Sequence, residues 1–170
     1  MHKVERLLGR IDNLNERVGR IVSYLCLLMM AVLMWEIVLR YFFNNPTIWA
    51  HETSALLYGT YFVLGGAYVL RHRAHVTMDI IYNRFSVRRR AILDLVGSSL
   101  FFIFCGLLLW EGGQLAWASL QLREYSETFW GPPLYPLKMT VPIGGFLILL
   151  QGLAKFIRDL NIAITGREIV

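Results

Sequence analysis

Hydrophobic residues dominate four long stretches of the chain, and short polar segments separate them. The stretches cover residues 21–43, 53–70, 91–120 and 141–157. A helix needs about 20 mostly apolar residues to cross the hydrocarbon core of a bilayer, and it satisfies its backbone polar groups internally. The pattern therefore predicts an all-α integral membrane protein with four transmembrane helices. We expect residues 1–170 to form a single membrane domain.

The first 20 residues form an amphipathic segment ahead of the first span. The apolar positions that recur on one helical face are Val4, Leu7, Leu8, Ile11, Leu14 and Val18, the spacing of an amphipathic helix. Two interpretations remain open: a helix lying in the cytoplasmic interface, or a plain extension of the first span. The long charged lead and the lack of a small-residue cleavage site argue against a cleaved signal peptide.

The positive charges are distributed asymmetrically between the connecting segments. The chain has 17 Lys and Arg residues, and most lie in residues 1–20, in the segment 71–90 and in the tail. The exceptions are Arg40, Arg123 and Lys138. Because cytoplasmic loops carry the excess of Lys and Arg, both termini and the Arg-rich loop are predicted to be cytoplasmic.

Composition and motifs exclude several functions. The chain is 56% hydrophobic and 17% charged, whereas soluble domains carry about 25% charged residues. The basic residues flank apolar spans, so nucleic acid is not an expected partner. Cys26 and Cys105 lie in apolar runs and show no zinc or redox spacing. The histidines lie near or outside the interface, unlike haem ligands, and no hydrolase or phosphate-loop motif occurs. We expect no enzyme activity, metal or cofactor.

The turn between the first two spans holds the first group of candidate site residues. Glu36 and Arg40 are one helical turn apart, so they share a face and can form an ion pair. The Asn-Asn-Pro sequence at 44–46 is expected to stop the helix. Trp49 suits the headgroup level, and Glu52 opens the second span. A charge within a membrane segment marks a pathway or a partner; here a structural pair, or one shared with another subunit, is favoured.

The second outer loop, residues 123–137, holds three of the five prolines and several aromatic residues. Such a sequence suits a semi-rigid cap at the membrane surface. It could be an interfacial turn or a docking surface for a soluble partner, and we favour docking for the loop as a whole. The candidate docking residues are Tyr125, Trp130, Pro132, Pro133 and Tyr135.

The segment after the second span holds Arg71, His75 and Asp79. It could be a solvated cytoplasmic loop. Alternatively, Asp79 pairs with Arg71 or Arg73 and folds the segment against the membrane, with His75 as a polar partner. The apolar residues that follow make an interfacial helix plausible.

The order of these features resembles the small membrane subunit of a tripartite ATP-independent periplasmic (TRAP) transporter. The matching sequences are E-I-V-L-R-Y-F-F-N-N-P at 36–46, G-G-A-Y-V-L-R-H-R-A-H-V-T-M-D at 65–79 and P-L-Y-P-L-K-M-T-V-P-I-G-G-F-L-I-L-L-Q-G-L at 133–153. The resemblance covers most of the chain. One departure is His51 before Glu52, where many relatives carry a second acidic residue.

The resemblance implies a role in a bacterial inner membrane. In such systems a periplasmic binding protein delivers an organic acid to a large membrane subunit, which carries the substrate and sodium sites. The small subunit packs beside it as a scaffold, contacts membrane lipids and helps to form the periplasmic docking surface. By this analogy the residues near the outer part of the subunit interface are Glu36, Arg40, Trp49 and Glu52, and those on its cytoplasmic side are Arg71, His75 and Asp79. The carboxyl-terminal third is most similar to branches linked to monocarboxylates or 2-oxo acids.

The main alternative is an autonomous four-helix multidrug exporter that uses Glu36 as its proton and cation site. Arg40 argues against it, because a neighbouring guanidinium would hold Glu36 ionised. The large Arg-rich loop argues against it as well. A second alternative is a structural or regulatory membrane protein with no part in transport.

Overall fold

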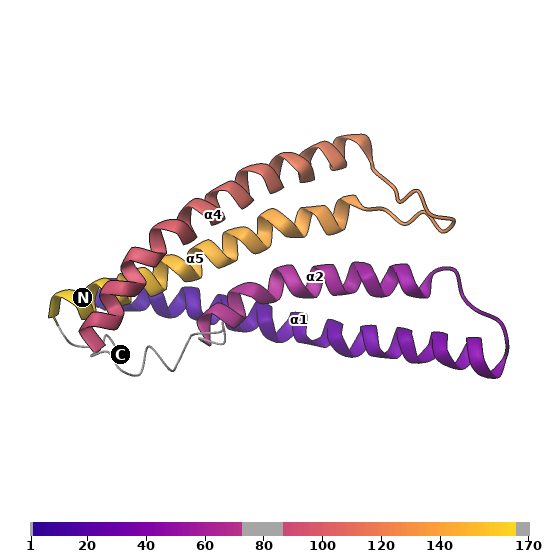
Figure 1. Ribbon diagram of the computed structural model, residues 1–170, viewed down its shortest axis with the longest axis horizontal. Helices are drawn as coiled ribbons and strands as arrows, with labels where there is room; N and C mark the ends of the chain where they lie inside the picture. Colours follow the sequence, from indigo (N-terminus) through magenta and orange to yellow (C-terminus); the bar gives the residue numbers. More distant parts are fainter. Residues whose placement is uncertain (1, 73–86, 166–170) are drawn as a thin grey trace.

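The computed structural model describes residues 2–72 and 87–165, which form four helices (Figure 1). They are α1 (His2–Phe42), α2 (Ala50–Arg71), α4 (Val87–Leu122) and α5 (Tyr135–Thr165). Each contains a segment long and apolar enough to cross a membrane. The predicted all-helical fold with four candidate spans is confirmed.

Helix α1 runs without a break through 41 residues, from His2 to Phe42. At 1.5 Å per residue its length is about 60 Å, roughly twice the thickness of the hydrocarbon core. Residues 2–20, which the sequence predicts to be amphipathic, and the first apolar stretch therefore form one continuous helix. That the early turns lie at the cytoplasmic interface stays a prediction.

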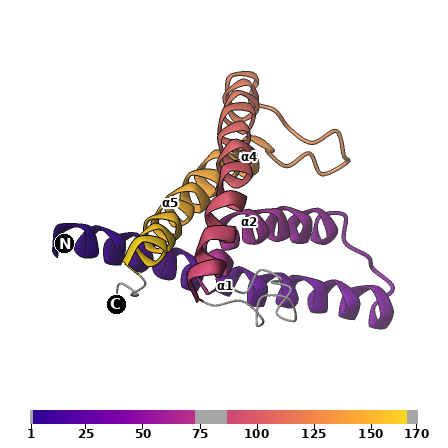
Figure 2. The same ribbon diagram turned by 60° about the vertical axis from the view of Figure 1, so that its left-hand side comes forward.

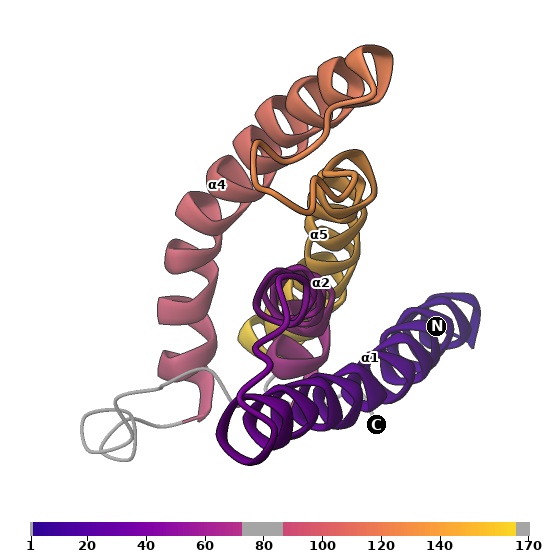
Figure 3. The same cartoon turned by 90° about the vertical axis from the view of Figure 1, so that its right-hand side faces the viewer.

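The helices are arranged in an open row in the order α4, α5, α2, α1 (Figure 3). Helix α5 is central, because it packs against both α4 and α2, while α1 packs mainly against α2. The α1–α2 pair diverges from the α4–α5 pair toward the end that holds the connections 43–49 and 123–134 (Figures 1 and 2). We call this the loop end. Helices α1 and α4 therefore form the two edges of the row.

Glycines allow the close contacts of α5 with its two neighbours. A Cβ atom added to Gly144 would lie 2.7 Å from the carbonyl oxygen of Val63 in α2. One added to Gly152 would lie 2.2 Å from the ring of Phe101 in α4. Small residues of this kind let helices approach closely where no hydrophobic effect drives them together.

At the loop end, the residues next to each helix end explain where α1 ends and where α5 begins. Asn44 adopts a left-handed conformation with φ 50°, and the N–H of Asn45 donates to the carbonyl of Leu39 at 3.1 Å. This is a common way to end a helix, and it confirms the predicted stop at 44–46. Helix α5 begins at Tyr135, two residues before the predicted end of the loop. Pro136 is tolerated there because the first turn needs no N–H donor.

Candidate functional site

Glu36 bonds the end of α1 to the connection that follows it. Its side chain is buried, and Arg40 donates to Oε1 from Nε at 3.0 Å and from Nη2 at 2.5 Å. Both the backbone N–H of Thr47, at 3.0 Å, and the hydroxyl of Thr47 donate to Oε2. Glu36 and Arg40 therefore do form an ion pair. The contribution of Thr47 was not predicted, although it lies beside the helix-stopping Asn-Asn-Pro sequence.

Glu52 joins the start of α2 to the second connection at the loop end. It lies in the first turn of α2, and its Oε1 accepts hydrogen bonds from Ser126 Oγ at 2.6 Å and Thr128 Oγ1 at 2.5 Å. Trp49 immediately precedes α2, and its carbonyl accepts from the N–H and the hydroxyl of Thr53, both at 2.9 Å. The carboxylate of Glu52 thus fixes the loop 123–134 against the start of α2.

The loop 123–134 has a defined fold of its own. The N–H of Ser126 donates to the carbonyl of Pro132, and that of Leu134 donates to the carbonyl of Glu124, both at 2.9 Å. Gly131 takes φ +57°, a conformation that glycine adopts without strain. These contacts bring the two limbs of the loop together as a short hairpin that extends past the ends of α4 and α5 (Figure 1).

An ion pair fixes the base of this hairpin. Lys138 Nζ, in the first turn of α5, lies 2.6 Å and 2.5 Å from the two carboxylate oxygens of Glu124. The hydrogen bond from Lys138 lowers the pKa of Glu124 below its ordinary value. Glu124 is therefore ionised at neutral pH, and its ion pair with Lys138 holds the base of the hairpin together.

The tip of the hairpin is aromatic and exposed. Phe129 and Trp130, at the tip, are 100% and 42% exposed, and Tyr125, on the first limb opposite Pro133, is 57% exposed. Among the predicted docking residues, Pro133 is exposed, Pro132 is buried, and Tyr135 is the first residue of α5. Phe129 was not among the predicted residues, although it directly precedes Trp130. That this surface serves in docking stays a prediction.

A buried polar cluster joins α1 to α5 at the opposite end of the molecule, which we call the cluster end. Asn15 and Gln151 are 1% and 2% exposed. Asn15 Nδ2 donates to Gln151 Oε1 at 2.6 Å, and Gln151 Nε2 donates to Asp12 Oδ1 at 2.9 Å. Arg158 forms an ion pair with the other oxygen of Asp12. The buried Asn15–Gln151 bond and the half-buried bonds of Asp12 fix the relative positions of the two helices.

Arg71 connects α2 to the same region of α1. Its Nη1 donates to Glu16 Oε2 at 2.6 Å and to the carbonyl of Asp12 at 2.8 Å. The alternative partner considered for Arg71 was Asp79, but Asp79 and His75 lie outside the described residues. The sequence does indicate a polar contact surface here, because Asp12, Asn15 and Glu16 have the i, i+3, i+4 spacing of one helical face.

The fold and these contacts define a multi-pass helical membrane protein in which the charges at both ends join helix to helix or helix to loop. Among the side chains that the structure describes, those of residues 6–72 and 95–164, no three His, Cys, Asp or Glu gather as a metal site. The family model of the DctQ component of tripartite ATP-independent periplasmic transporters matches residues 29–161. The chain belongs to this family.

Two curated relatives carry matching descriptions. The sialic acid TRAP transporter small permease protein SiaQ of Vibrio cholerae serotype O1 is 24% identical over 151 residues, covering 88% of this chain and 84% of the relative. The C4-dicarboxylate TRAP transporter small permease protein DctQ of Rhodobacter capsulatus is 26% identical over 108 residues, covering 61% of this chain and 45% of the relative.

These matches confirm the resemblance inferred from the sequence. The chain is a TRAP transporter subunit of the small permease class and a multi-pass protein of the bacterial inner membrane. Its family consists of transport proteins, and the autonomous exporter is not favoured. The two relatives are named for different solutes, sialic acid and C4-dicarboxylate.

Proposed function

We propose that this chain is the scaffold subunit of a sodium-coupled secondary transporter for organic acids that depends on a periplasmic binding protein. It packs against the large transport subunit and contributes to the surface on which the binding protein docks. The observation that carries this proposal is the bonding of the loop 123–134 to the start of α2 through Glu52. A surface held in one conformation costs less entropy to bind than a loose one.

The proposed orientation puts the loop end in the periplasm and both termini in the cytoplasm. The excess of Lys and Arg in residues 1–20 and in the segment 71–90 supports it. In this orientation the exposed aromatic hairpin tip faces the soluble partner. Tyr and Trp side chains are enriched at the energetic centres of protein interfaces.

The proposed contact with the large subunit rests on the open arrangement of the helices. The edge helices expose large apolar side chains, among them Met34 and Trp35 on α1 and Leu107 and Trp110 on α4. Either lipid or another membrane subunit can cover such faces. Glu36 and Glu52 are bonded within the chain, so we expect them to shape the interface rather than to bridge it. Arg40, whose side chain is 54% exposed, is available for direct contact.

The proposed transported solute is an organic acid, and the resemblance of the carboxyl-terminal third favours a monocarboxylate or a 2-oxo acid. The solute and sodium sites are assigned to the large subunit. The buried carboxylate of Glu36 and the half-buried one of Asp12 serve contacts within this chain, which supports that division.

The test is co-purification followed by reconstitution. The tagged chain is purified from its native bacterium in mild detergent, and the proteins that accompany it are identified. We expect a larger polytopic membrane protein in a fixed ratio. The pair, with the cognate binding protein, is then reconstituted into liposomes and should take up an organic acid only with an inward sodium gradient. Recovery of the chain alone, as a dimer that binds lipophilic cations, would contradict the proposal.

A further inference from the structure

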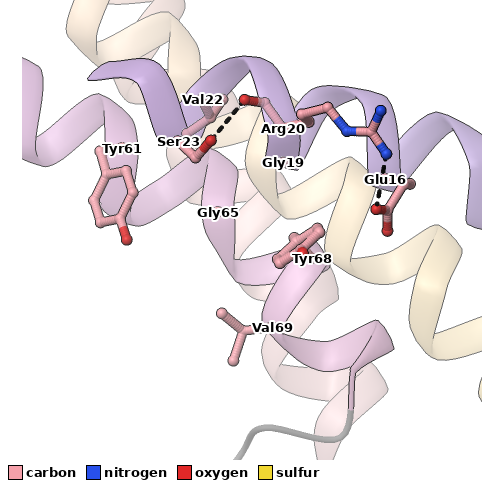
Figure 4. Close-up of a pocket in the computed structure, with 9 residues that line it drawn as sticks. All are labelled: Glu16, Gly19, Arg20, Val22, Ser23, Tyr61, Gly65, Tyr68 and Val69. Atoms are coloured by element: carbon pink, nitrogen blue, oxygen red, sulfur yellow. Dashed lines mark hydrogen bonds and ion pairs between the residues drawn. The ribbon is translucent and has the colours of Figure 1, made fainter. Parts of the chain in front are cut away.

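A groove of about 180 Å³ lies between α1 and α2 on the cluster-end side (Figure 4). Helix α1 lines it with Glu16, Arg20 and Val22, and helix α2 lines it with Tyr61, Gly65 and Val69. One end of the lining is charged and the other is apolar. A groove with this polarity fits a ligand that has a charged head and an apolar chain.

Arg20 provides the charged end of the groove. Its side chain is 71% exposed, and its Nη2 lies 3.4 Å from Glu16 Oε1. Glu16 already accepts a shorter hydrogen bond, of 2.6 Å, from Arg71. Arg20 therefore interacts with Glu16 more weakly than Arg71 does. Its guanidinium can turn toward an incoming anion. A guanidinium binds phosphate oxygens in pairs.

Gly65 provides the floor of the apolar end. A Cβ atom added to Gly65 would meet nothing within 4 Å, whereas one added to Gly19 would lie 2.3 Å from the ring of Tyr68. The ring of Tyr68 thus fills the space beside Gly19 and leaves the space beside Gly65 open. Figure 4 shows Tyr61 and Val69 on either side of Gly65. The open strip follows α2 from Val69 to Tyr61, about 12 Å at the helical rise.

We propose that this groove binds one anionic phospholipid from the leaflet at the cluster end. Its phosphate contacts Arg20, and one acyl chain lies along Gly65. The charge of Arg20 complements an anionic headgroup, and the apolar strip runs away from it along the helix, as an acyl chain does. The groove is too small for another helix, whose diameter with side chains is about 10 Å. Only the assignment of this leaflet to the cytoplasmic side rests on the proposed function.

The test uses the full chain together with any membrane subunit that co-purifies, stripped of lipid in detergent and titrated with phosphatidylglycerol. Native mass spectrometry counts bound lipid in the wild type, Gly65→Leu, Arg20→Gln and the control Gly106→Leu. Gly106, on α4, likewise has nothing within 4 Å of an added Cβ. We expect one tightly bound lipid in the wild type and in the control. Gly65→Leu should bind about tenfold more weakly, as when roughly two methylene groups lose their burial.

Arg20→Gln should abolish the preference for phosphatidylglycerol over phosphatidylcholine while leaving weak binding of both. Glycerol phosphate, which has the anionic head without the chain, should not compete. Unchanged lipid binding in Gly65→Leu would overturn the proposal, and so would full competition by glycerol phosphate, which would indicate a simple phosphate site. If Gly65→Leu fails to fold, Val69→Trp at the groove rim replaces it with the same expected loss. Sodium-driven uptake is measured separately, so failure of lipid binding leaves the transport assignment intact.

Discussion

The two ends of this molecule use charged and polar side chains in different ways. At the loop end, the carboxylates of Glu36 and Glu52 accept hydrogen bonds from hydroxyl groups of the connections, and Glu36 also accepts from the guanidinium of Arg40 in its own helix. At the cluster end, Asn15 and Gln151 are almost completely buried between two helices. Buried polar contacts are costly to leave incomplete, whereas exposed ones exchange readily with water. The comparison indicates that the cluster end fixes the helices and the loop end shapes a surface.

The largest effect is expected from breaking the cluster end. Gln151→Leu keeps most of the side-chain volume but removes both hydrogen bonds to Asn15 and Asp12. Leaving buried polar groups without partners should lower the free energy of unfolding by roughly 1–3 kcal/mol. Denaturant unfolding of the purified protein measures it. Gln114→Leu, on an exposed position of α4, is the control, and an equal loss there would contradict the assigned role.

A smaller effect is expected from Glu36→Gln at the loop end. The neutral amide loses the charge-assisted bonds with Arg40 but can still accept from Thr47. We expect reduced recovery of the large subunit in co-purification and a proportional fall in uptake. Glu111→Gln, exposed on α4, should change neither. Complete loss of uptake with normal assembly would instead favour a proton-carrying role for Glu36.

A still more local effect is expected from releasing the hairpin. Glu52→Gln weakens the contacts with Ser126 and Thr128 while leaving the helices intact. We expect unchanged unfolding but a several-fold higher concentration of binding protein for half-maximal uptake, because the docking surface must then be ordered on binding. Titration of the binding protein in liposomes measures this. The neighbouring Glu127→Gln, exposed in the same hairpin, should behave as wild type.

The smallest effect concerns pH. The pKa of Glu124 lies below its ordinary value of 4.5 because Lys138 donates to the carboxylate. A depressed folded-state pKa stabilises the protein above the unfolded pKa, and this stabilisation is lost as pH falls through the folded value. Acid should therefore loosen the hairpin only well below neutrality. Limited proteolysis of the hairpin between pH 7 and pH 3 tests this, and Lys138→Gln should shift the onset toward higher pH.

The sequence predicted the helices better than their contacts. Apolar length identified the four spans, and the Asn-Asn-Pro stop and the Glu36–Arg40 pair followed from local spacing. The hydrogen bonds that Ser126 donates to Glu52 and that Asn15 donates to Gln151 join residues far apart in the chain. No local periodicity specifies such pairs, because they depend on how the helices pack and where the hairpin lies against α2. The resemblance to a family supplied the role in transport, which the residues alone did not specify.

The unbroken α1 has a mechanical consequence. From Asn15, held in the buried cluster, to Phe42 at the helix end, the rod is about 40 Å long. A tilt of about 5° around this pivot would move the far end by about 3 Å, the length of a hydrogen bond. Any rotation of α1 about Asn15 would therefore produce its largest displacement near the end where Glu36 bonds to the turn.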